Sequence, residues 1–474
     1  MSMDGFVIAS GSRYRREPFG GILYNSVRGY TIEVNKTTQT FLELLGAGMK
    51  VDGAMMELSG HFKMSEADIK RDFKPVIDNL VQFGILVEPR SEQQDQRVDR
   101  DAVSRALDMS FPRQLVKNSL NAPEVIHLAI TGKCPLKCPA CYVDAGVALD
   151  SELSTHDIVR FIDIMDDNSV FQLGLGGGEA LVHPDIVEIT SHATRKGITV
   201  AITTSGVNLT TEMAIALKQA GIKQIQISHD GFSKEIFEQT RSPGSFNIAK
   251  QAINTLKKNA IDFGFNVLVT PSVLRELPQL VKYAEEIGAV ELILLRPKPS
   301  GRHGQETWFE TNKLTAAHQA WLTNFLGTLH TTLRIRTDTS FCMLYHFLDA
   351  KDLYAAGVFG CTAARRFCSI AADGSMFPCS HFFQFPEYNG GSCLNLMENW
   401  QKSPAFDSFR SIDDNIDEPC RSCTNMNVCK GCRKVAVHET GSFTGIDPYC
   451  HKIVVAKQQG CKIPICHGGD GSSA

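Results

Sequence analysis

Long apolar runs and an excess of charge of either sign are both missing from this sequence. It contains no stretch of about 18 consecutive apolar residues, so we expect no membrane-spanning helix. The first residues, MSMDGFVIASGSRYRREPFGG, lack the apolar core of a signal peptide, which predicts a cytoplasmic protein. The formal net charge is −4, which argues against a general attraction to nucleic acid or to an anionic membrane.

Cysteine, in contrast, is abundant. The 474 residues include 15 Cys, and thiols are kept reduced in the cytosol. We therefore interpret them as metal or redox ligands rather than as a disulfide framework. The chain is long enough for about two to four domains.

The N-terminal part predicts a small domain between two irregular segments. We expect residues 1–16 to form a loose terminus and residues 93–122 to form a polar linker. Between them, residues 17–92 predict a β-hairpin that turns near Arg28 and Gly29, two helices and a closing strand. This order resembles a winged helix-turn-helix.

Residues 123–335 alternate between apolar strand patterns and amphipathic helix patterns. The expected strands are residues 124–130, 170–176, 198–205, 223–228, 263–270 and 290–296, and the expected helices between them are residues 154–167, 184–197, 211–221, 247–259 and 277–288. Six such units in series predict a parallel sheet with right-handed crossovers. We therefore predict an α/β fold, a partial (β/α)6 TIM-like barrel with chemistry at the C-terminal ends of its strands.

Three cysteines fall in the loop after the first of these strands. Cys134, Cys138 and Cys141 form the spacing C-x3-C-x2-C. A structural zinc site would need a fourth ligand from elsewhere in the chain, and a zinc knuckle of that kind is one alternative. A four-iron cluster held by three thiolates leaves one iron open to a substrate or cofactor.

The spacing and its place after the first strand resemble the radical S-adenosylmethionine enzymes. The family usually has an aromatic residue or His before the third Cys, whereas this chain has Ala140 there and Tyr142 after it. The resemblance implies that the open iron binds S-adenosylmethionine. Cleavage of that cofactor would give a 5′-deoxyadenosyl radical, which abstracts hydrogen from carbon.

Further segments resemble cofactor-binding motifs of the same family, each at a predicted strand end. The resemblance implies that Glu179 accepts from the cofactor ammonium and that Arg241 contacts its carboxylate. Taken singly, such residues could equally be turn formers or surface ion pairs. The implied cofactor-binding residues are Gly177, Gly178, Glu179, Thr204, Ser205, Ser228, Asp230 and Arg241.

The C-terminal cysteines resemble the SPASM extension, which carries auxiliary iron–sulfur clusters. The expected domain is residues 336–460, followed by a tail at 461–474. By this resemblance one [4Fe–4S] cluster is held by Cys420, Cys423, Cys429 and Cys450, and the other by Cys361, Cys379, Cys432 and Cys368. With the radical cluster this makes three. Two zinc ribbons could use the same residues. We expect Cys342 and Cys393 to be small buried side chains rather than ligands, and we assign no role to Cys461 and Cys466.

Residues 17–92 also resemble the peptide-recognition element related to the chaperone of pyrroloquinoline quinone biosynthesis, PqqD. In that family the element binds a leader peptide as an added strand. A DNA-binding winged helix would need a basic recognition helix, but EADIKRDFKPVIDNLVQ is mixed in charge.

Together these resemblances imply a maturase that modifies a ribosomally made precursor peptide, with flavodoxin or ferredoxin as electron donor. A Cys thioether, as in sactipeptide and ranthipeptide synthases, is the first expectation for the product, with a carbon–carbon bond or decarboxylation left open. Sulfatase maturation is disfavoured, because those enzymes carry Asp where this chain has Ser380. The alternatives are an enzyme of cofactor or tetrapyrrole biosynthesis and a non-enzymatic peptide-binding scaffold.

Overall fold

The computed structural model describes residues 5–27, 29–88, 98–304, 306–345, 350–355, 358–450 and 452–453. These residues form two compact units, Met1–Val116 and Lys117–Ala474. Cys461 and Cys466 lie outside the described residues, as does the side chain of Cys342.

The first unit packs helices on a small antiparallel sheet. The sheet has the order β2-β3-β4, and a second, two-stranded sheet pairs β1 with β5. Apolar side chains such as Leu23, Phe41, Leu58 and Phe73 form the core of this unit. The strands are β1 (Val7–Ile8), β2 (Ser12–Glu17), β3 (Gly20–Asn25), β4 (Tyr30–Asn35) and β5 (Leu86–Val87), and the helices are α1 (Lys36–Gly46), α2 (Val51–Phe62), α3 (Glu66–Gln82) and α4 (Arg100–Leu107).

The predicted hairpin is present, but both segments that we expected to be irregular contain regular structure. Within residues 1–16, β1 pairs with the distant strand β5, and most of β2 forms a hairpin with the next strand, β3. Within the expected linker, α4 starts at the N-cap residue Asp99 and buries Val103 and Ala106 in the core of the unit.

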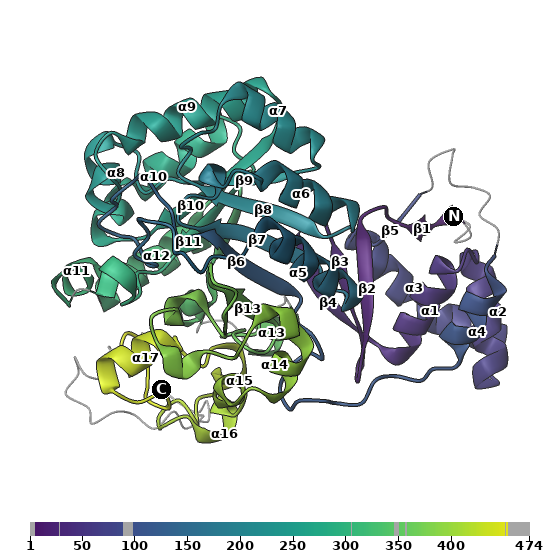
Figure 1. The fold of residues 1–474 in the computed structure, drawn as a ribbon. Helices are drawn as coiled ribbons and strands as arrows, with labels where there is room; N and C mark the ends of the chain where they lie inside the picture. The colour runs from purple at the N-terminus through teal and green to yellow at the C-terminus, as the bar shows by residue number, and fades with distance from the viewer. Residues whose placement is uncertain are drawn as a thin grey trace. The chain divides into compact units, whose positions relative to one another are not determined.

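The second unit is built on one nine-stranded sheet of order β12-β11-β10-β9-β8-β7-β6-β13-β14 (Figure 1). Neighbouring strands from β6 to β12 run parallel, and β13 joins β6 in parallel while β14 pairs antiparallel. The strands are β6 (Val125–Thr131), β7 (Gln172–Gly177), β8 (Thr199–Thr204), β9 (Gln224–Ser228), β10 (Asp262–Leu268), β11 (Glu291–Leu295), β12 (Arg334–Thr337), β13 (Phe367–Ile370) and β14 (Met376–Phe377).

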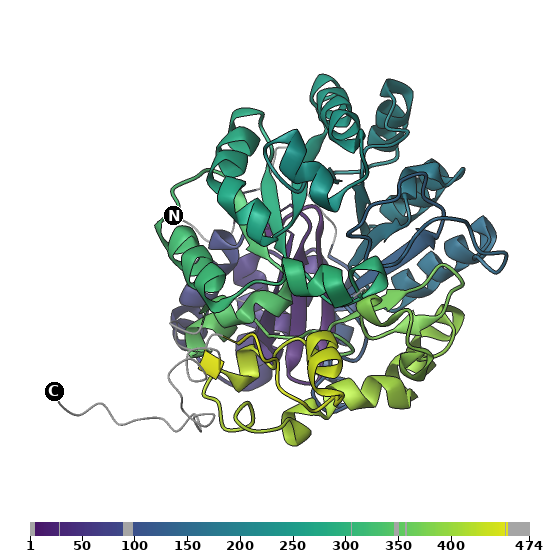
Figure 2. The same ribbon diagram turned by 90° about the vertical axis from the view of Figure 1, so that its left-hand side faces the viewer.

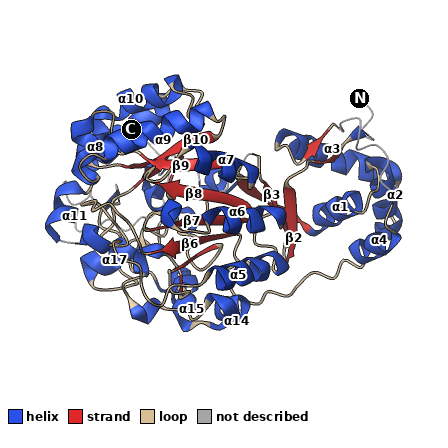
Figure 3. Ribbon diagram, turned by 45° about the horizontal axis from the view of Figure 1, so that its top comes forward, coloured by secondary structure: helices blue, strands red, loops and turns tan. Residues whose placement is uncertain are grey.

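Helices between the strands cover the outer face of this sheet (Figure 3). They bury apolar residues such as Phe161 and Leu277 against alternate strand residues, and the six expected βα units are confirmed. The structure adds β12, β13 and β14 to the six expected strands. The helices are α5 (Thr155–Asp167), α6 (Ile186–Arg195), α7 (Thr211–Gln219), α8 (Lys234–Thr240), α9 (Ser245–Lys258), α10 (Pro271–Glu286), α11 (Glu306–Asn312) and α12 (Ala316–Thr328).

After β12 the chain forms short helices and turns that gather along one side of the barrel (Figure 2). Trp400, Phe406 and Phe409 are buried there and join the core of the barrel. The helices are α13 (Ala350–Ala355), α14 (Leu396–Lys402), α15 (Pro404–Arg410), α16 (Ile412–Asn415) and α17 (Arg433–Thr440).

Candidate functional site

The first cysteine trio lies in the loop that follows β6, as its spacing predicted. Backbone hydrogen bonds fold this loop back on itself: Cys134 N donates to Gly146 O at 2.9 Å, and Gly146 N donates to Gly132 O at 3.0 Å. Ala145 N lies 3.3 Å from the Cys141 sulfur and donates to it. The loop is therefore shaped by its own backbone, with a thiol already accepting a hydrogen bond.

Two residues that the sequence gave no sign of brace the same loop. Ser242 Oγ accepts from Lys137 N at 2.6 Å and lies 3.7 Å from the Cys138 sulfur. The guanidinium of Arg302 donates to the carbonyls of Cys138, at 2.8 Å, and Ala145. Both residues come from distant parts of the chain, so only the fold reveals their role.

Burial of Cys134 favours its neutral thiol. It raises the pKa of Cys134 to about 11, and the charges of Glu179 and of the other two cysteines act in the same direction. Metal coordination requires the thiolate, so binding a cluster here must release a proton.

The glycines after β7 allow this loop to approach closely. A Cβ on Gly178 would stand 2.3 Å from Lys133 O, and one on Gly177, whose φ is +102°, would stand 2.6 Å from Thr131 O. The expected contact with a cofactor amino group remains a prediction, but the structure shows a second reason for both glycines.

Glu179 is buried and its carboxylate is oriented by the end of β8. Thr204 Oγ1 donates to Oε1 at 2.5 Å, while Ser205 donates to Oε2 through its backbone N at 2.9 Å and its hydroxyl at 2.5 Å. Burial raises the pKa of Glu179, although these hydrogen bonds oppose the rise. Three of the predicted cofactor residues therefore meet at one point.

Ser228 and Asp230 are buried at the end of β9, and Asp230 fixes Arg241. Asp230 Oδ1 accepts from Leu268 N at 2.7 Å, and Oδ2 accepts from Thr240 Oγ1 at 2.9 Å and Arg241 Nε at 2.5 Å. Burial lowers the pKa of Arg241, but Asp230 outweighs this and the net shift is upward. The structure thus makes Asp230 a support for Arg241, whose guanidinium stays charged.

One of the two expected C-terminal cysteine sets surrounds a single small pocket. Cys420, Cys423, Cys429 and Cys450 line a space of about 30 Å³ together with Asp447 and Lys430. Burial raises the pKa of Cys420 to about 12 and that of Cys429 to about 11. Four thiols around one cavity fit the donor set of an iron–sulfur cluster.

The second set is brought together in part. Burial raises the pKa of Cys379 to about 12, and the charges of nearby Cys361 and Cys432 add to the rise. Cys368 lies in β13 and is fully buried in the hydrophobic core. Burial raises the pKa of its thiol, and the charge of nearby Cys393 raises it further. Its strand pairs with β6 inside the sheet, and the role of Cys368 as fourth ligand stays a prediction.

Buried charges surround this second set, and the sequence did not single them out. Arg296, just after β11, donates to both carboxylate oxygens of Asp447 at 2.7 and 2.9 Å, and Asp447 also accepts from Cys432 N at 3.0 Å. Lys298 donates to Asp338 at 2.6 Å. The Arg296–Asp447 ion pair therefore joins the barrel to the cysteine-rich segment next to the thiols.

An aromatic contact connects the first trio to the C-terminal segment. The ring of Tyr142 lies 5.0 Å from that of His381, and His381 Nδ1 is hydrogen-bonded to Ser300 Oγ at 2.6 Å. The His381 ring therefore has a packing and hydrogen-bonding role.

Neither zinc alternative gains a defined site. Among the described residues, no group of three or more His, Cys, Asp or Glu side chains could hold a single metal ion.

Among the residues that the structure describes, no helix is both long and apolar enough to cross a membrane.

Comparisons with known proteins show the family to which the chain is similar. Residues 128–284 match the model of the Radical SAM superfamily, and residues 361–424 match that of SPASM, an iron–sulfur cluster-binding domain. Mycofactocin maturase MftC of Mycobacterium ulcerans is 31% identical over 339 residues, covering 70% of this chain and 89% of that protein. AdoMet-dependent heme synthase of Methanosarcina barkeri is 27% identical over 347 residues, covering 70% and 97%.

A solved structure shares the fold of almost the whole chain. SuiB of Streptococcus suis bound to S-adenosylmethionine gives a TM-score of 0.70 at 18% identity, covering 94% of this chain and 99% of that one. SuiB bound to the precursor peptide SuiA gives 0.68. The chain belongs to the radical SAM superfamily, as an enzyme that uses S-adenosylmethionine, a [4Fe–4S] cluster and auxiliary clusters in a SPASM domain.

Proposed function

We propose that this enzyme modifies a ribosomally made precursor peptide by abstracting hydrogen from it and forming an oxidative crosslink. The similarity to a mycofactocin maturase supports a peptide substrate. The observation that carries the proposal is the N-terminal unit, because the chain devotes residues 1–116 to a separate small sheet with helices. A small molecule would give this unit no evident task.

The leader of the peptide would add to the outer edge of β4. The sheet order β2-β3-β4 leaves β2 and β4 at the edges. Strand β2 carries Arg13, Arg15 and Arg16, and charged edge strands discourage pairing. Strand β4 carries one charged residue, Glu33, so its backbone is the better template for an extended peptide.

The cysteines, Glu179 and Arg241 of the barrel site then have stated roles. Cys134, Cys138 and Cys141 would hold the cluster, which together with bound S-adenosylmethionine supplies the 5′-deoxyadenosyl radical. Glu179, oriented by Thr204 and Ser205, would accept a hydrogen bond from the cofactor ammonium. Arg241, fixed by Asp230, would pair with the cofactor carboxylate.

A Cys thioether is the first choice for the bond formed. In such a product a substrate sulfur joins a substrate carbon, with the loss of two hydrogen atoms, so one further electron must leave the peptide after hydrogen abstraction. An auxiliary cluster held by the C-terminal cysteines would accept this electron. A carbon–carbon bond or a decarboxylation is the second choice. We place the enzyme in the cytoplasm, with flavodoxin or ferredoxin as the donor.

A second candidate function is tetrapyrrole chemistry, favoured by the similarity to a heme synthase over 97% of that protein. The experiment that separates the two is co-expression of the enzyme with short peptides encoded beside its gene, followed by mass spectrometry. A peptide that loses the mass of two hydrogen atoms per crosslink supports the proposal. Unmodified peptides, with turnover of a porphyrin precursor by the purified enzyme, would support the second candidate.

A further inference from the structure

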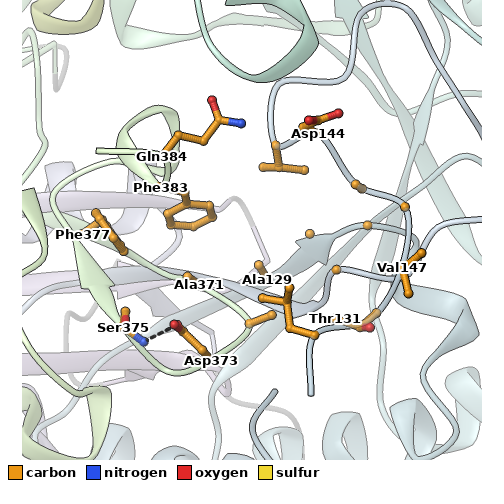
Figure 4. Close-up of a pocket in the computed structure, with 18 of the residues that line it drawn as sticks. Ala129, Thr131, Asp144, Val147, Ala371, Asp373, Ser375, Phe377, Phe383 and Gln384 are labelled. Atoms are coloured by element: carbon orange, nitrogen blue, oxygen red, sulfur yellow. Dashed lines mark hydrogen bonds between the residues drawn. The ribbon is translucent and has the colours of Figure 1, made fainter. Parts of the chain in front are cut away.

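A cavity of about 480 Å³ lies between the barrel and the SPASM segment (Figure 4). One wall comes from the end of β6, from Gly177 and Gly178, which are also expected to contact the cofactor, and from the chain just after the first cysteine trio. The opposite wall comes from the β13–β14 hairpin and the residues that follow Phe383. A volume of this size accommodates several side-chain-sized groups.

The lining is mainly apolar, with the polar side chains of Thr131, Ser375, Gln384 and Asn389 among it, and no Lys or Arg of the described residues lines it. Phe377 and Phe383 form an aromatic wall, with ring centroids 5.3 Å apart. The titratable residues that line the cavity are both acidic: Asp144 is paired with Arg302, and Asp373 accepts from Ser375 N. This lining disfavours carboxylates and phosphates, and it suits an apolar side chain.

The cavity is lined in part by the loop that carries the first cysteine trio. Ala145 and Gly146 line it, and these two residues are hydrogen-bonded to the Cys141 sulfur and to Cys134 N respectively. At its rim, Val147 is 87% exposed (Figure 4). An apolar group seated here would hold the adjoining peptide beside the loop that carries the cluster.

We propose that this cavity is a specificity pocket that seats an apolar or aromatic side chain of the substrate peptide next to the residue that reacts. The inference rests on the proposed peptide function and names the side-chain class that the site prefers. It predicts that acidic residues at the corresponding substrate position are rejected, because Asp144 and Asp373 lie in the lining.

Two substitutions on opposite walls narrow the pocket. A Cβ on Gly146 would meet nothing within 4 Å, so Gly146→Leu projects its side chain into open space. Ala371→Leu fills the cavity from the SPASM side. Gly327→Leu is the matched control, because a Cβ there also meets nothing and Gly327 lies in α12, away from the cavity.

The probe is the capped tripeptide acetyl-Gly-(4-fluorophenylalanine)-Gly-methylamide, titrated into the cluster-loaded enzyme and followed by fluorine NMR. We expect saturable binding that weakens about tenfold in Gly146→Leu and Ala371→Leu, the size of effect that changes in an apolar pocket produce. Gly327→Leu should bind like the unaltered enzyme. The Leu tripeptide should compete, and the Asp tripeptide should not.

Three results would overturn the inference. The first is probe binding in both pocket variants that is as tight as in the unaltered enzyme. The others are competition by the Asp tripeptide equal to that of the Leu tripeptide, and no saturable binding of the probe. Displacement of the probe by S-adenosylmethionine would also overturn it, because the cavity would then belong to the cofactor. The proposed function is judged separately. Probe binding without modification of any precursor peptide would contradict that function, whereas peptide modification with unaltered probe binding in both variants would contradict the pocket.

Discussion

At the scale of single residues, Glu179 tests whether the cofactor site is assembled as the geometry indicates. We expect Glu179→Ala to weaken S-adenosylmethionine binding by roughly ten- to a hundredfold, because the lost hydrogen bond between charged groups is worth about 1.5–3 kcal/mol. Calorimetry on the cluster-loaded enzyme measures this. Iron content is the control and should not change, since Glu179 is not a thiol ligand. Unchanged affinity would mean that the carboxylate only closes the turn with Thr204 and Ser205.

Cys368 and Cys432 make a second comparison at this scale. Cys432 lies near Cys379, whereas Cys368 lies in the buried strand β13. We therefore expect Cys432→Ala to remove about four iron atoms per chain after anaerobic reconstitution, while Cys368→Ala removes none. Loss of iron in Cys368→Ala, without loss of folding by circular dichroism, would restore Cys368 as a ligand.

Prediction from sequence succeeded best where the signal is local. Cys134, Cys138 and Cys141 lie within one loop, so their spacing can be recognised from a short stretch of sequence. Ser242 and Arg302 contact that loop from more than 100 residues away, and a lone Ser or Arg has no distinguishing pattern. Such supports become visible only when the fold has brought them together.

At the scale of elements, the packing of helices α8, α9 and α10 against β9 buries His229 and makes the stability of the fold depend on pH. His229 is 1% exposed, stacks on Phe265 at 4.5 Å, and contacts rings of Phe237 and Tyr283. Burial lowers the pKa of His229 from 6.5 to about 4. The unfolded chain therefore binds a proton at mildly acidic pH that the folded chain does not, and folded stability falls as the pH drops from 6.5 towards 4.

This contribution amounts to a loss of about 2 kcal/mol between pH 7 and pH 5. Urea unfolding at the two pH values measures it. The variant His229→Phe should lose about that much less stability on acidification. His156→Gln is the control, since the His156 side chain is 87% exposed and should leave the difference unaltered. Identical acid sensitivity in His229→Phe and the unaltered chain would contradict the assignment.

The elements themselves were predictable where apolar periodicity is strong. All six strands from β6 to β11 were expected, because each is a buried apolar run followed by an amphipathic helix. The start of α10 was missed by several residues, since the helix begins at Pro271 with Thr270 as its cap and tolerates Pro278 inside. Strand β1 and helix α4 were missed because short segments depend on tertiary partners rather than on pattern.

At the scale of the whole molecule, recognition and chemistry should be separable. A chain that starts at Lys117 keeps every described thiol and should still cleave S-adenosylmethionine slowly without substrate. We expect it to lose most turnover of a full precursor peptide, and residues 1–116 added in trans should restore part. The restoration should weaken when Ile32 in β4 is replaced by Pro, which removes a backbone donor. Full turnover without the N-terminal unit would contradict leader capture.

The central claim is that a radical generated in the barrel removes hydrogen from a peptide carbon. Its most direct test uses a precursor peptide deuterated at every carbon of its core segment, incubated anaerobically with cluster-loaded enzyme, S-adenosylmethionine and a reductant. The account predicts 5′-deoxyadenosine that carries deuterium from the peptide, in step with loss of the same deuterium from the modified product. A modified peptide formed together with 5′-deoxyadenosine that carries no deuterium would contradict it.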